Sequence, residues 1–315
     1  MTPEDLAGRA IEFARVVKRY GATTAVNELT LSVARGQMFG LIGPDGAGKT
    51  TTIRLLCGLL HPDEGEITML GRDPITDHRA MTASVGYLSQ RFSLYGDLTI
   101  DENIAFFAEI HGVGDYAAKR NRLLDMTQLT PFRQRLADKL SGGMKQKLAL
   151  ACTLVHEPDI ILLDEPTTGV DPVSRREFWK LLTQFVEQGI TILMSTPYLD
   201  EAERCHRIAM LHEGQVLALD EPGRLRASLP GTWFEVVIDQ PRQAAAKLQA
   251  VEDAPDIYLF GDRLHVWNRR DEPGAARDAL DRTLATIGLV ARGVRSITPS
   301  LEDVFIARIT GSATS

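Results

Sequence analysis

The stretch GPDGAGKT at residues 43–50 decides how the rest of the chain is interpreted. It follows the apolar run MFGLIG (38–43) and leads into KTTTIRLLCGLL (49–60), so a glycine loop is expected between a buried strand and a helix. In that setting G-x-x-x-x-G-K-[ST] lets backbone N–H groups converge on phosphate oxygens. Lys49 would reach the β- and γ-phosphates, and Thr50 would offer its hydroxyl to Mg²⁺. The predicted nucleotide-binding residues of this loop are Gly43, Pro44, Asp45, Gly46, Ala47, Gly48, Lys49, Thr50 and Thr51.

The composition indicates an ordinary globular protein. The chain has 315 residues, of which 44% are hydrophobic and 24% are charged, and this length suggests two domains. A net charge of −7 provides no basic field for binding nucleic acid. The start MTPEDLAGRA lacks the apolar core of a signal peptide, and no apolar run reaches the roughly 18–20 residues of a membrane helix. Cys57, Cys152 and Cys205 are too widely spaced for a metal or redox motif and indicate reduced thiols in a cytosolic protein.

Short apolar runs predict a parallel sheet in the first two thirds of the chain. SVGYLSQ (84–90), DIILLDE (159–165) and ITILMST (190–196) are nearly continuous hydrophobic segments, as expected for strands covered on both faces. The segment 98–157 is predicted to be mostly helical and inserted between two of these strands. Residues 11–35 alternate and favour short antiparallel strands, with turns expected at Gly21 and at Asn27-Glu28.

The last third of the chain has a different pattern. The composition shifts at PGRLRASLPG (222–231), which predicts a linker at 223–230. Beyond it, the order strand, helix, hairpin, helix, strand gives a βαββαβ pattern that is typical of ferredoxin-like domains. A last helix should follow, capped by Ser300.

Two adjacent carboxylates end the apolar run IILLDE (160–165). Successive residues of a strand point to opposite sides, so the two carboxylates can have different roles. Asp164 would hold the Mg²⁺ shell, and Glu165 would polarise an attacking water as general base. A solvated acidic strand end is the simpler alternative, and the upstream phosphate loop argues against it.

The stretch LSGGMKQ (140–146) predicts the start of a helix. Ser141 can cap it, and Gly142 and Gly143 leave the amides accessible to an anion. Alone it would be only a helix start. Combined with the phosphate loop and the acidic pair, it forms a specific set of motifs.

With these three motifs, residues of about 10–222 resemble the ATP-binding cassette (ABC) ATPases. The resemblance implies that Gln90 contacts Mg²⁺ or water and senses a membrane partner, and that Tyr20 stacks on adenine. It also implies that Asp171 belongs to a dimer-contact loop, GVDP (169–172). The signature residues would complete the site of the opposite subunit; they are Leu140, Ser141, Gly142, Gly143 and Met144.

The predicted fold class is α/β. It comprises a P-loop NTPase core with an antiparallel β subdomain and a helical signature subdomain, plus a small C-terminal α+β domain of ferredoxin-like βαββαβ order. The expected boundaries are an ATPase domain at 1–222, with its helical part at about 98–157, a linker at 223–230 and an accessory domain at 231–315. That accessory domain could be regulatory, dimerising or merely stabilising.

A closer similarity links the chain to ATPase subunits of ABC-2-type exporters, the drug and polysaccharide efflux group. STPYLDEAERCHRIAMLHEGQVLALDEP (195–222) and PSLEDVFIARIT (299–310) carry it. It implies ATP and Mg²⁺ as cofactors, a separate transmembrane permease and a second ATPase subunit, in a homodimer or a heterodimer. The protein would then lie on the cytoplasmic face of the cell membrane. Phe92, Leu94 and Tyr95 would either receive a permease helix or only pack the helical insertion.

Two positions depart from the family pattern. Asp45 stands where asparagine is usual, and its carboxylate would mildly repel a triphosphate unless it points outward. Pro197 stands where a histidine usually reaches the γ-phosphate, so hydrolysis at this site is expected to be impaired. His206 is expected about two turns into the following helix, too far away to substitute.

Two other classes of function fit the sequence less well. Soluble ABC proteins of DNA repair or translation often carry two cassettes or long coiled-coil insertions, and neither is found in this sequence. P-loop kinases and GTPases lack the signature sequence.

Overall fold

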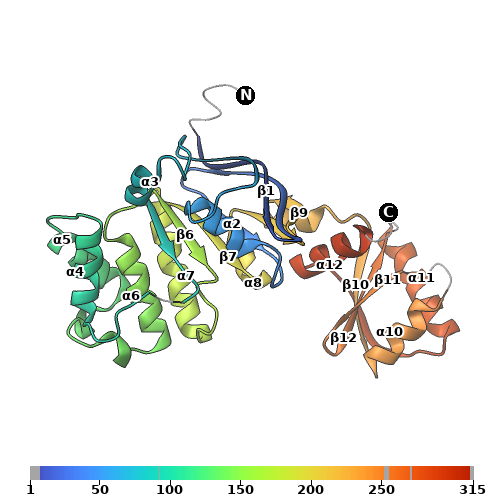
Figure 1. The fold of residues 1–315 in the computed structure, drawn as a ribbon. Helices are drawn as coiled ribbons and strands as arrows, with labels where there is room; N and C mark the ends of the chain where they lie inside the picture. The colour runs from blue at the N-terminus through green and yellow to red at the C-terminus, as the bar shows by residue number, and fades with distance from the viewer. Residues whose placement is uncertain (1–7, 92, 252–254, 270–271, 313–315) are drawn as a thin grey trace. The chain divides into compact units, whose positions relative to one another are not determined.

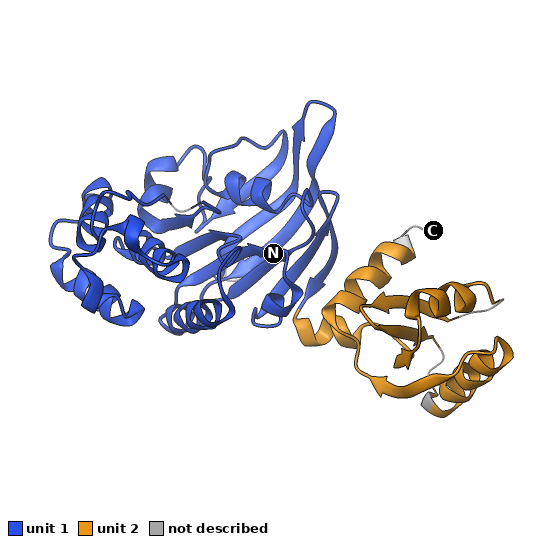
Figure 2. Ribbon diagram, turned by 90° about the horizontal axis from the view of Figure 1, so that it is seen from below, with its two compact units in different colours: residues 1–220 blue, residues 221–315 orange. Residues whose placement is uncertain are grey.

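The computed structural model describes all residues except 1–7, 92, 252–254, 270–271 and 313–315. The chain divides into two compact units, residues 1–220 and 221–315 (Figures 1 and 2). Among the helices of the described residues, none combines the length and apolar character that crossing a bilayer requires.

A six-stranded sheet forms the centre of the first unit. Its order is β5-β6-β7-β3-β8-β9, parallel except for the last strand. All residues of β3, β6 and β7 are buried, which explains their largely apolar sequences. The strands are β3 (Met38–Ile42), β5 (Val85–Leu88), β6 (Ile160–Asp164), β7 (Thr191–Thr196), β8 (Arg207–His212) and β9 (Gln215–Asp220).

Helices follow several of these strands and pack on the sheet (Figure 1). The helix α2 (Lys49–Leu56) contacts β6 and β7, and α7 (Pro172–Glu187) contacts β7. Proline opens α7 directly after its capping residue, where no backbone N–H is needed. Two short helices, α3 (His78–Ser84) and α8 (Leu199–Ala202), precede β5 and follow β7.

A three-stranded antiparallel sheet of order β2-β1-β4 packs against the same core. Its strands are β1 (Arg9–Tyr20), β2 (Thr23–Ala34) and β4 (Glu64–Met69), and the predicted turn at Gly21 joins the first two. The predicted turn at Asn27-Glu28 is wrong, because β2 continues through these residues. A shift in register between the pairs Val16–Leu29 and Lys18–Val26 absorbs an extra residue as a bulge, with Glu28 at φ 52°.

Three helices occupy the segment that was predicted to be helical. They are α4 (Ile100–Ile110), α5 (Ala117–Thr127) and α6 (Gly142–Leu154), with single 3₁₀ turns at Thr130–Phe132 and Ala137–Lys139. A capping box fixes the start of α4, since Thr99 and Glu102 each bond the other's backbone N–H.

The second unit has the ferredoxin-like arrangement. Its four strands are antiparallel in the order β11-β12-β10-β13, with an apolar core beneath α10 and α11. The segment expected as a linker contains instead the helix α9 (Pro222–Ala227). The other elements are β10 (Thr232–Ile238), α10 (Pro241–Gln249), β11 (Asp256–Phe260), β12 (Arg263–Asn268), α11 (Pro273–Thr286), β13 (Ala291–Ile297) and α12 (Leu301–Ser312).

The last helix, α12, is anchored at its start. The Ser300 hydroxyl accepts a hydrogen bond from the Asp303 N–H at 3.2 Å, as its predicted capping role requires. The buried Asp303 carboxylate in turn accepts from the Ser300 N–H and lies 2.8 Å from the His265 ring on β12. The aromatic side chains Trp233, Tyr258 and Trp267 cluster with α12 residues.

Candidate nucleotide-binding site

Close backbone packing explains the glycines between β3 and α2. A Cβ on Gly43 would lie 2.3 Å from the Leu211 carbonyl oxygen, and one on Gly48 would lie 2.3 Å from the Ala25 carbonyl oxygen. Gly46 and Gly48 also have φ angles of 80° and 97°, which favour glycine. The loop therefore wraps around the start of α2, where free backbone N–H groups suit an anion.

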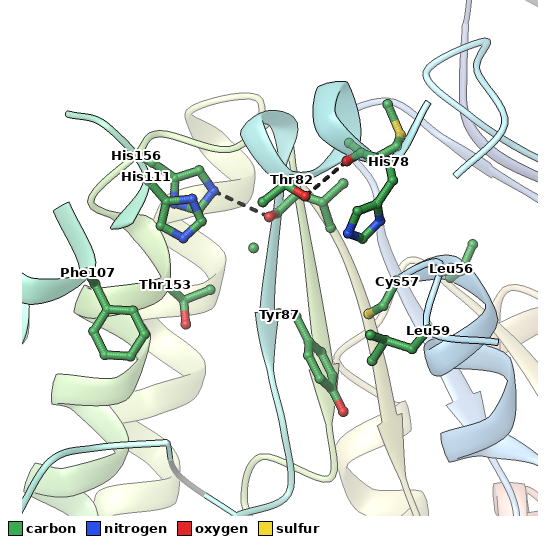
Figure 3. A pocket seen from close by; sticks show the side chains of 13 residues that line it. Leu56, Cys57, Leu59, His78, Thr82, Tyr87, Phe107, His111, Thr153 and His156 are labelled. Atoms are coloured by element: carbon green, nitrogen blue, oxygen red, sulfur yellow. Dashed lines mark hydrogen bonds between the residues drawn. The ribbon is translucent and has the colours of Figure 1, made fainter. Parts of the chain in front are cut away.

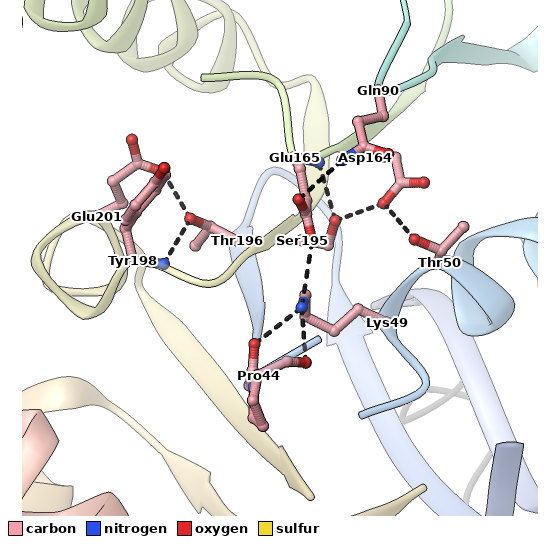
Figure 4. Close-up of polar contacts among 11 residues, drawn as sticks. Pro44, Lys49, Thr50, Gln90, Asp164, Glu165, Ser195, Thr196, Tyr198 and Glu201 are labelled. Atoms are coloured by element: carbon pink, nitrogen blue, oxygen red, sulfur yellow. Dashed lines mark hydrogen bonds and ion pairs between the residues drawn. The ribbon is translucent and has the colours of Figure 1, made fainter. Parts of the chain in front are cut away.

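The Lys49 ammonium lies inside this loop. The side chain is 4% exposed and donates hydrogen bonds to the Gly43 and Pro44 carbonyls at 2.8 and 3.0 Å. It also lies 3.2 Å from a carboxylate oxygen of Glu165 (Figure 4). The ammonium therefore links the phosphate loop to the end of β6.

Asp164 is the meeting point of three segments. Its buried carboxylate accepts hydrogen bonds from the Thr50 hydroxyl at 3.1 Å and from the Ser195 hydroxyl at 2.7 Å. The hard oxygen donors of Thr50 and Asp164 suit Mg²⁺. Sequence reasoning missed Ser195, because one serine in an apolar strand gives no signal of its own.

Glu165 has a left-handed backbone conformation, with φ 48°. Such strain in a residue other than glycine persists only when its surroundings hold it. Here the Glu165 N–H donates to Ser195, at 2.9 Å to the hydroxyl and 3.2 Å to the carbonyl. The carboxylate also accepts a hydrogen bond from the Gln90 side chain at 3.2 Å. The general-base candidate and the predicted sensor therefore contact each other directly.

A pocket of about 520 Å³ opens over these groups. Asp45 and Tyr20 lie at its exposed side, Tyr20 being 46% exposed, and Ala47 is buried beneath the loop. Exposure lets water screen the extra carboxylate of Asp45. The lining residues are Tyr20, Thr23, Thr24, Ala25, Asp45, Gly46, Gly48, Lys49, Thr50, Thr51, Gln90 and Glu165.

The signature residues 140–144 lie at the start of α6 and are not part of that lining. The Ser141 hydroxyl caps the helix by accepting from the Met144 N–H at 3.3 Å. A Cβ on Gly143 would lie 2.2 Å from the Ser174 hydroxyl, so this glycine lets α6 approach α7 closely. Ser141 and Gly142 remain exposed.

Asp171 caps α7. Its carboxylate accepts from the Val173 and Ser174 N–H groups at 3.1 and 3.0 Å. Hydrogen bonds from Ser174 lower the pKa of this carboxyl. The residue predicted in the dimer-contact loop is thus also the helix cap.

Comparison with known proteins identifies the family. A family model described as "ABC transporter" matches residues 26–168. A probable multidrug ABC transporter ATP-binding protein of Escherichia coli, YbhF, is 42% identical over 301 residues, which cover 92% of this chain and 50% of YbhF. The Nod factor export ATP-binding protein I of Burkholderia pseudomallei is 37% identical over 307 residues, which cover 96% of this chain and 97% of that protein. The chain belongs to the ABC transporter family. Among its members it is similar to ATP-binding proteins of exporter type, as the sequence resemblance predicted.

Solved structures of ABC cassettes have the same fold. The dimeric cassette MJ0796, in a post-hydrolysis state with ADP and Pi, is 26% identical with a TM-score of 0.61, covering 67% of this chain and 98% of that one. The predicted fold class is therefore confirmed. The chain spans about half the length of YbhF.

Pro197, which stands where the resemblance predicts a histidine, is the first residue after β7 and is half-buried. It offers no side-chain donor and no N–H. The expectation that His206 lies within a helix is wrong, because α8 ends at Ala202. His206 directly precedes β8, and its ring nitrogen accepts from the Met38 N–H at 3.0 Å. Met38 begins β3, whereas the phosphate loop follows the other end of that strand, so His206 cannot reach it.

Glu201 is a further buried carboxylate close to the ABC site, and no sequence motif pointed to it. It accepts hydrogen bonds from the Thr167 hydroxyl at 2.6 Å and the Thr196 hydroxyl at 2.8 Å. Figure 4 shows Thr196 and Ser195, neighbours on β7, between Glu201 and Glu165.

A second cavity, of about 290 Å³, is lined by residues of α2, α3, β5, α4 and α6 (Figure 3). The rings of His111 and His156 stack in it with centroids 3.9 Å apart. Burial, with a smaller effect of His111, lowers the pKa of His156 to about 4.

The loop after Gln90 was expected to present aromatic and apolar side chains. Phe92 lies outside the described residues, and Leu94 is half-buried. Tyr95 is 45% exposed while its ring packs edge-on against Phe106 at 4.5 Å. Tyr95 therefore packs on the helical segment and is also accessible to a partner.

Proposed function

We propose that the chain binds ATP with Mg²⁺ in the pocket over the phosphate loop and hydrolyses it there. The observation that carries the proposal is the convergence of Lys49, Asp164 and Glu165 from two separate segments. Lys49 lies 3.2 Å from Glu165, Thr50 donates a hydrogen bond to Asp164, and Gln90 donates one to Glu165. Each side chain is of the type that phosphoryl transfer requires.

In this proposal the residues have distinct roles. Lys49 neutralises charge on the β- and γ-phosphates. Its contacts with the phosphates then replace its hydrogen bonds to the loop carbonyls. Thr50, Asp164 and Gln90 hold Mg²⁺, which supplies charge neutralisation for the phosphates when bound. Glu165 accepts the proton of the attacking water, and Gln90 orients its carboxylate. Tyr20 supports the adenine at the rim.

A second ATPase subunit or domain completes the site. Residues 140–144 lie outside the pocket of their own chain, and Ser141 and Gly142 are exposed at a helix start suited to phosphate. We infer that they contact nucleotide held by the partner, with Asp171 at the junction. The dimeric MJ0796 cassette supports this arrangement.

ATP binding and hydrolysis by this chain drive export through a separate transmembrane permease. Support comes from the names of the relatives, a multidrug transporter ATP-binding protein and a Nod factor export protein. The chain would then act at the cytoplasmic face of the membrane, and the 221–315 unit would regulate or dimerise the assembly. The permease determines the substrate.

The test measures phosphate release by the purified chain with Mg²⁺ and ATP, against Lys49→Ala. Turnover should disappear in the variant, because the loop loses its buried positive charge. Turnover that persists in Lys49→Ala would refute the site. Co-purification of the tagged chain with a membrane protein tests the permease, and co-purification with ribosomes or DNA instead would refute export.

A further inference from the structure

Glu201 is a buried charge that the proposed reaction does not use. Its side chain is 1% exposed, and a buried carboxylate is costly unless it is paired or hydrogen-bonded. Its partners, Thr167 and Thr196, come from two different segments, one after β6 and one at the end of β7. The carboxylate therefore ties these segments together.

The first tie reaches the turn that follows the catalytic carboxylate. The Thr168 N–H donates to the Glu165 carbonyl, and the Val170 N–H donates to the Thr167 carbonyl, both at 3.2 Å. Thr167 thus lies in the middle of two linked turns, and its hydroxyl fixes both to Glu201. The tie from Thr167 to Glu201 therefore acts on the turn that begins at Glu165.

The second tie reaches the strand end next to Pro197. The Thr196 hydroxyl donates to Glu201 and accepts from the Tyr198 N–H at 3.0 Å. The Tyr198 N–H therefore holds the turn around Pro197, which has no N–H of its own.

A third group, Arg175, connects Glu201 to the loop of Asp171. The backbone N–H of Arg175 donates to the Asp171 carbonyl at 2.9 Å, so Arg175 lies one turn into α7. Its Nε atom is 3.5 Å from the Glu201 carboxylate, and its guanidinium carbon is 4.8 Å from the Tyr198 ring centroid. That Nε is buried and makes no hydrogen bond within the described residues, so the charge of Glu201 is its compensation.

These contacts hold Glu165 in its left-handed conformation from both sides of β7. Ser195 binds its N–H directly, while Thr196 acts through Glu201 and Thr167. We propose that Glu201 is a positioning residue of the hydrolytic site, which sets Glu165 and the 169–172 loop relative to the end of β7. This inference rests on the proposed ATPase function.

The expected kinetic effect of removing Glu201 is a fall in kcat with little change in KM. A displacement of about 1 Å can cost about a hundredfold in rate, so Glu201→Gln should lower kcat by about 10- to 100-fold. KM for ATP should stay within about threefold, because Glu201 does not line the pocket. Thr167→Val removes the same tie from the other end and should give the same split. The double variant should lose no more than the larger single loss, since both act through one contact.

A second measurement does not depend on catalysis. Amide hydrogen exchange of peptides covering 165–170 should speed up in Glu201→Gln and Thr167→Val, because the two turns lose their anchor. Asp200→Asn is the matched control. It removes an exposed carboxylate from the same short helix and should change neither kcat nor exchange.

A kcat for Glu201→Gln within threefold of wild type overturns the proposal, whatever the exchange shows. If that variant does not fold, Thr167→Val takes its place under the same criterion. A parallel rise in KM would show a general loosening of the pocket and would also overturn it. Wild-type protein without Lys49-dependent turnover would refute the ATPase function instead, and exchange at 165–170 would still decide whether Glu201 anchors the turns.

Discussion

Replacing Pro197 by histidine tests whether a missing side chain limits hydrolysis. Along β7 the Ser195 hydroxyl points to Asp164, whereas Thr196 points to Glu201. Because successive strand side chains alternate, residue 197 is expected on the side of Ser195, where Glu165 also lies. The proline ring has no N–H, so the substitution removes no backbone hydrogen bond. We therefore expect an imidazole there to point toward the phosphate loop.

The size of the gain follows from one charge-assisted hydrogen bond. Such a bond contributes about 1.5–3 kcal/mol. Since about 1.4 kcal/mol corresponds to a factor of ten in rate, Pro197→His should raise kcat by about 10- to 100-fold if the bond forms only in the transition state. The Tyr198–Thr196 contact would keep the turn in place, so the backbone should need little adjustment.

Steady-state phosphate release should be compared for wild type, Pro197→His and Pro197→Ala. The alanine variant removes the ring without adding a donor and should turn over like wild type. An equal gain in both variants would assign the effect to the ring rather than to the imidazole. No gain in Pro197→His, alone or in the assembled transporter, would mean that other groups already do this work and that the site is not impaired.

Three further outcomes are expected. Glu165→Gln should bind ATP but lose its base, so ATP-bound dimers should accumulate on size-exclusion chromatography, and wild-type turnover in this variant would rule out Glu165 as the base. Ser141→Ala should harm the assembled transporter more than Pro197→His helps it if an unlike ATPase subunit is the partner, as ATPase rates of the complex would show; equal effects would favour a homodimer. Burial lowers the pKa of His156 from 6.5 to about 4, so between these pH values the unfolded chain binds more protons and stability falls as pH falls. His156→Gln should therefore reduce the drop in urea midpoint between pH 7 and pH 5, and an unchanged drop would contradict that assignment.

The phosphate loop was predictable because its signal is local. Glycines at 43 and 48 are needed for close backbone packing, and the lysine and threonine follow at fixed spacing. Apolar runs also predicted the strands β3, β5, β6 and β7 of the central sheet, and turn signals predicted the succession of strands and helices along the second unit.

Features that depend on tertiary packing were not predictable. Nothing in the sequence shows that Ser195 and Thr196 point to opposite carboxylates, because that depends on the register of β7 beside β6. The bulge at Glu28 resembles a turn locally, and pairing with β1 converts it into continuous strand. The position of His206 was missed because α8 is only one turn long.

The stacked aromatic side chains of the second unit provide an optical label. The chain has three tryptophans, of which Trp233 and Trp267 lie face to face with centroids 5.2 Å apart and 9° between their planes. Trp179, on α7, belongs to the first unit. Two indoles this close should couple excitonically, which changes their absorption and circular dichroism in a way that Trp179 does not share. Spectroscopy of the native chain can therefore follow the melting of each unit separately, with no added dye.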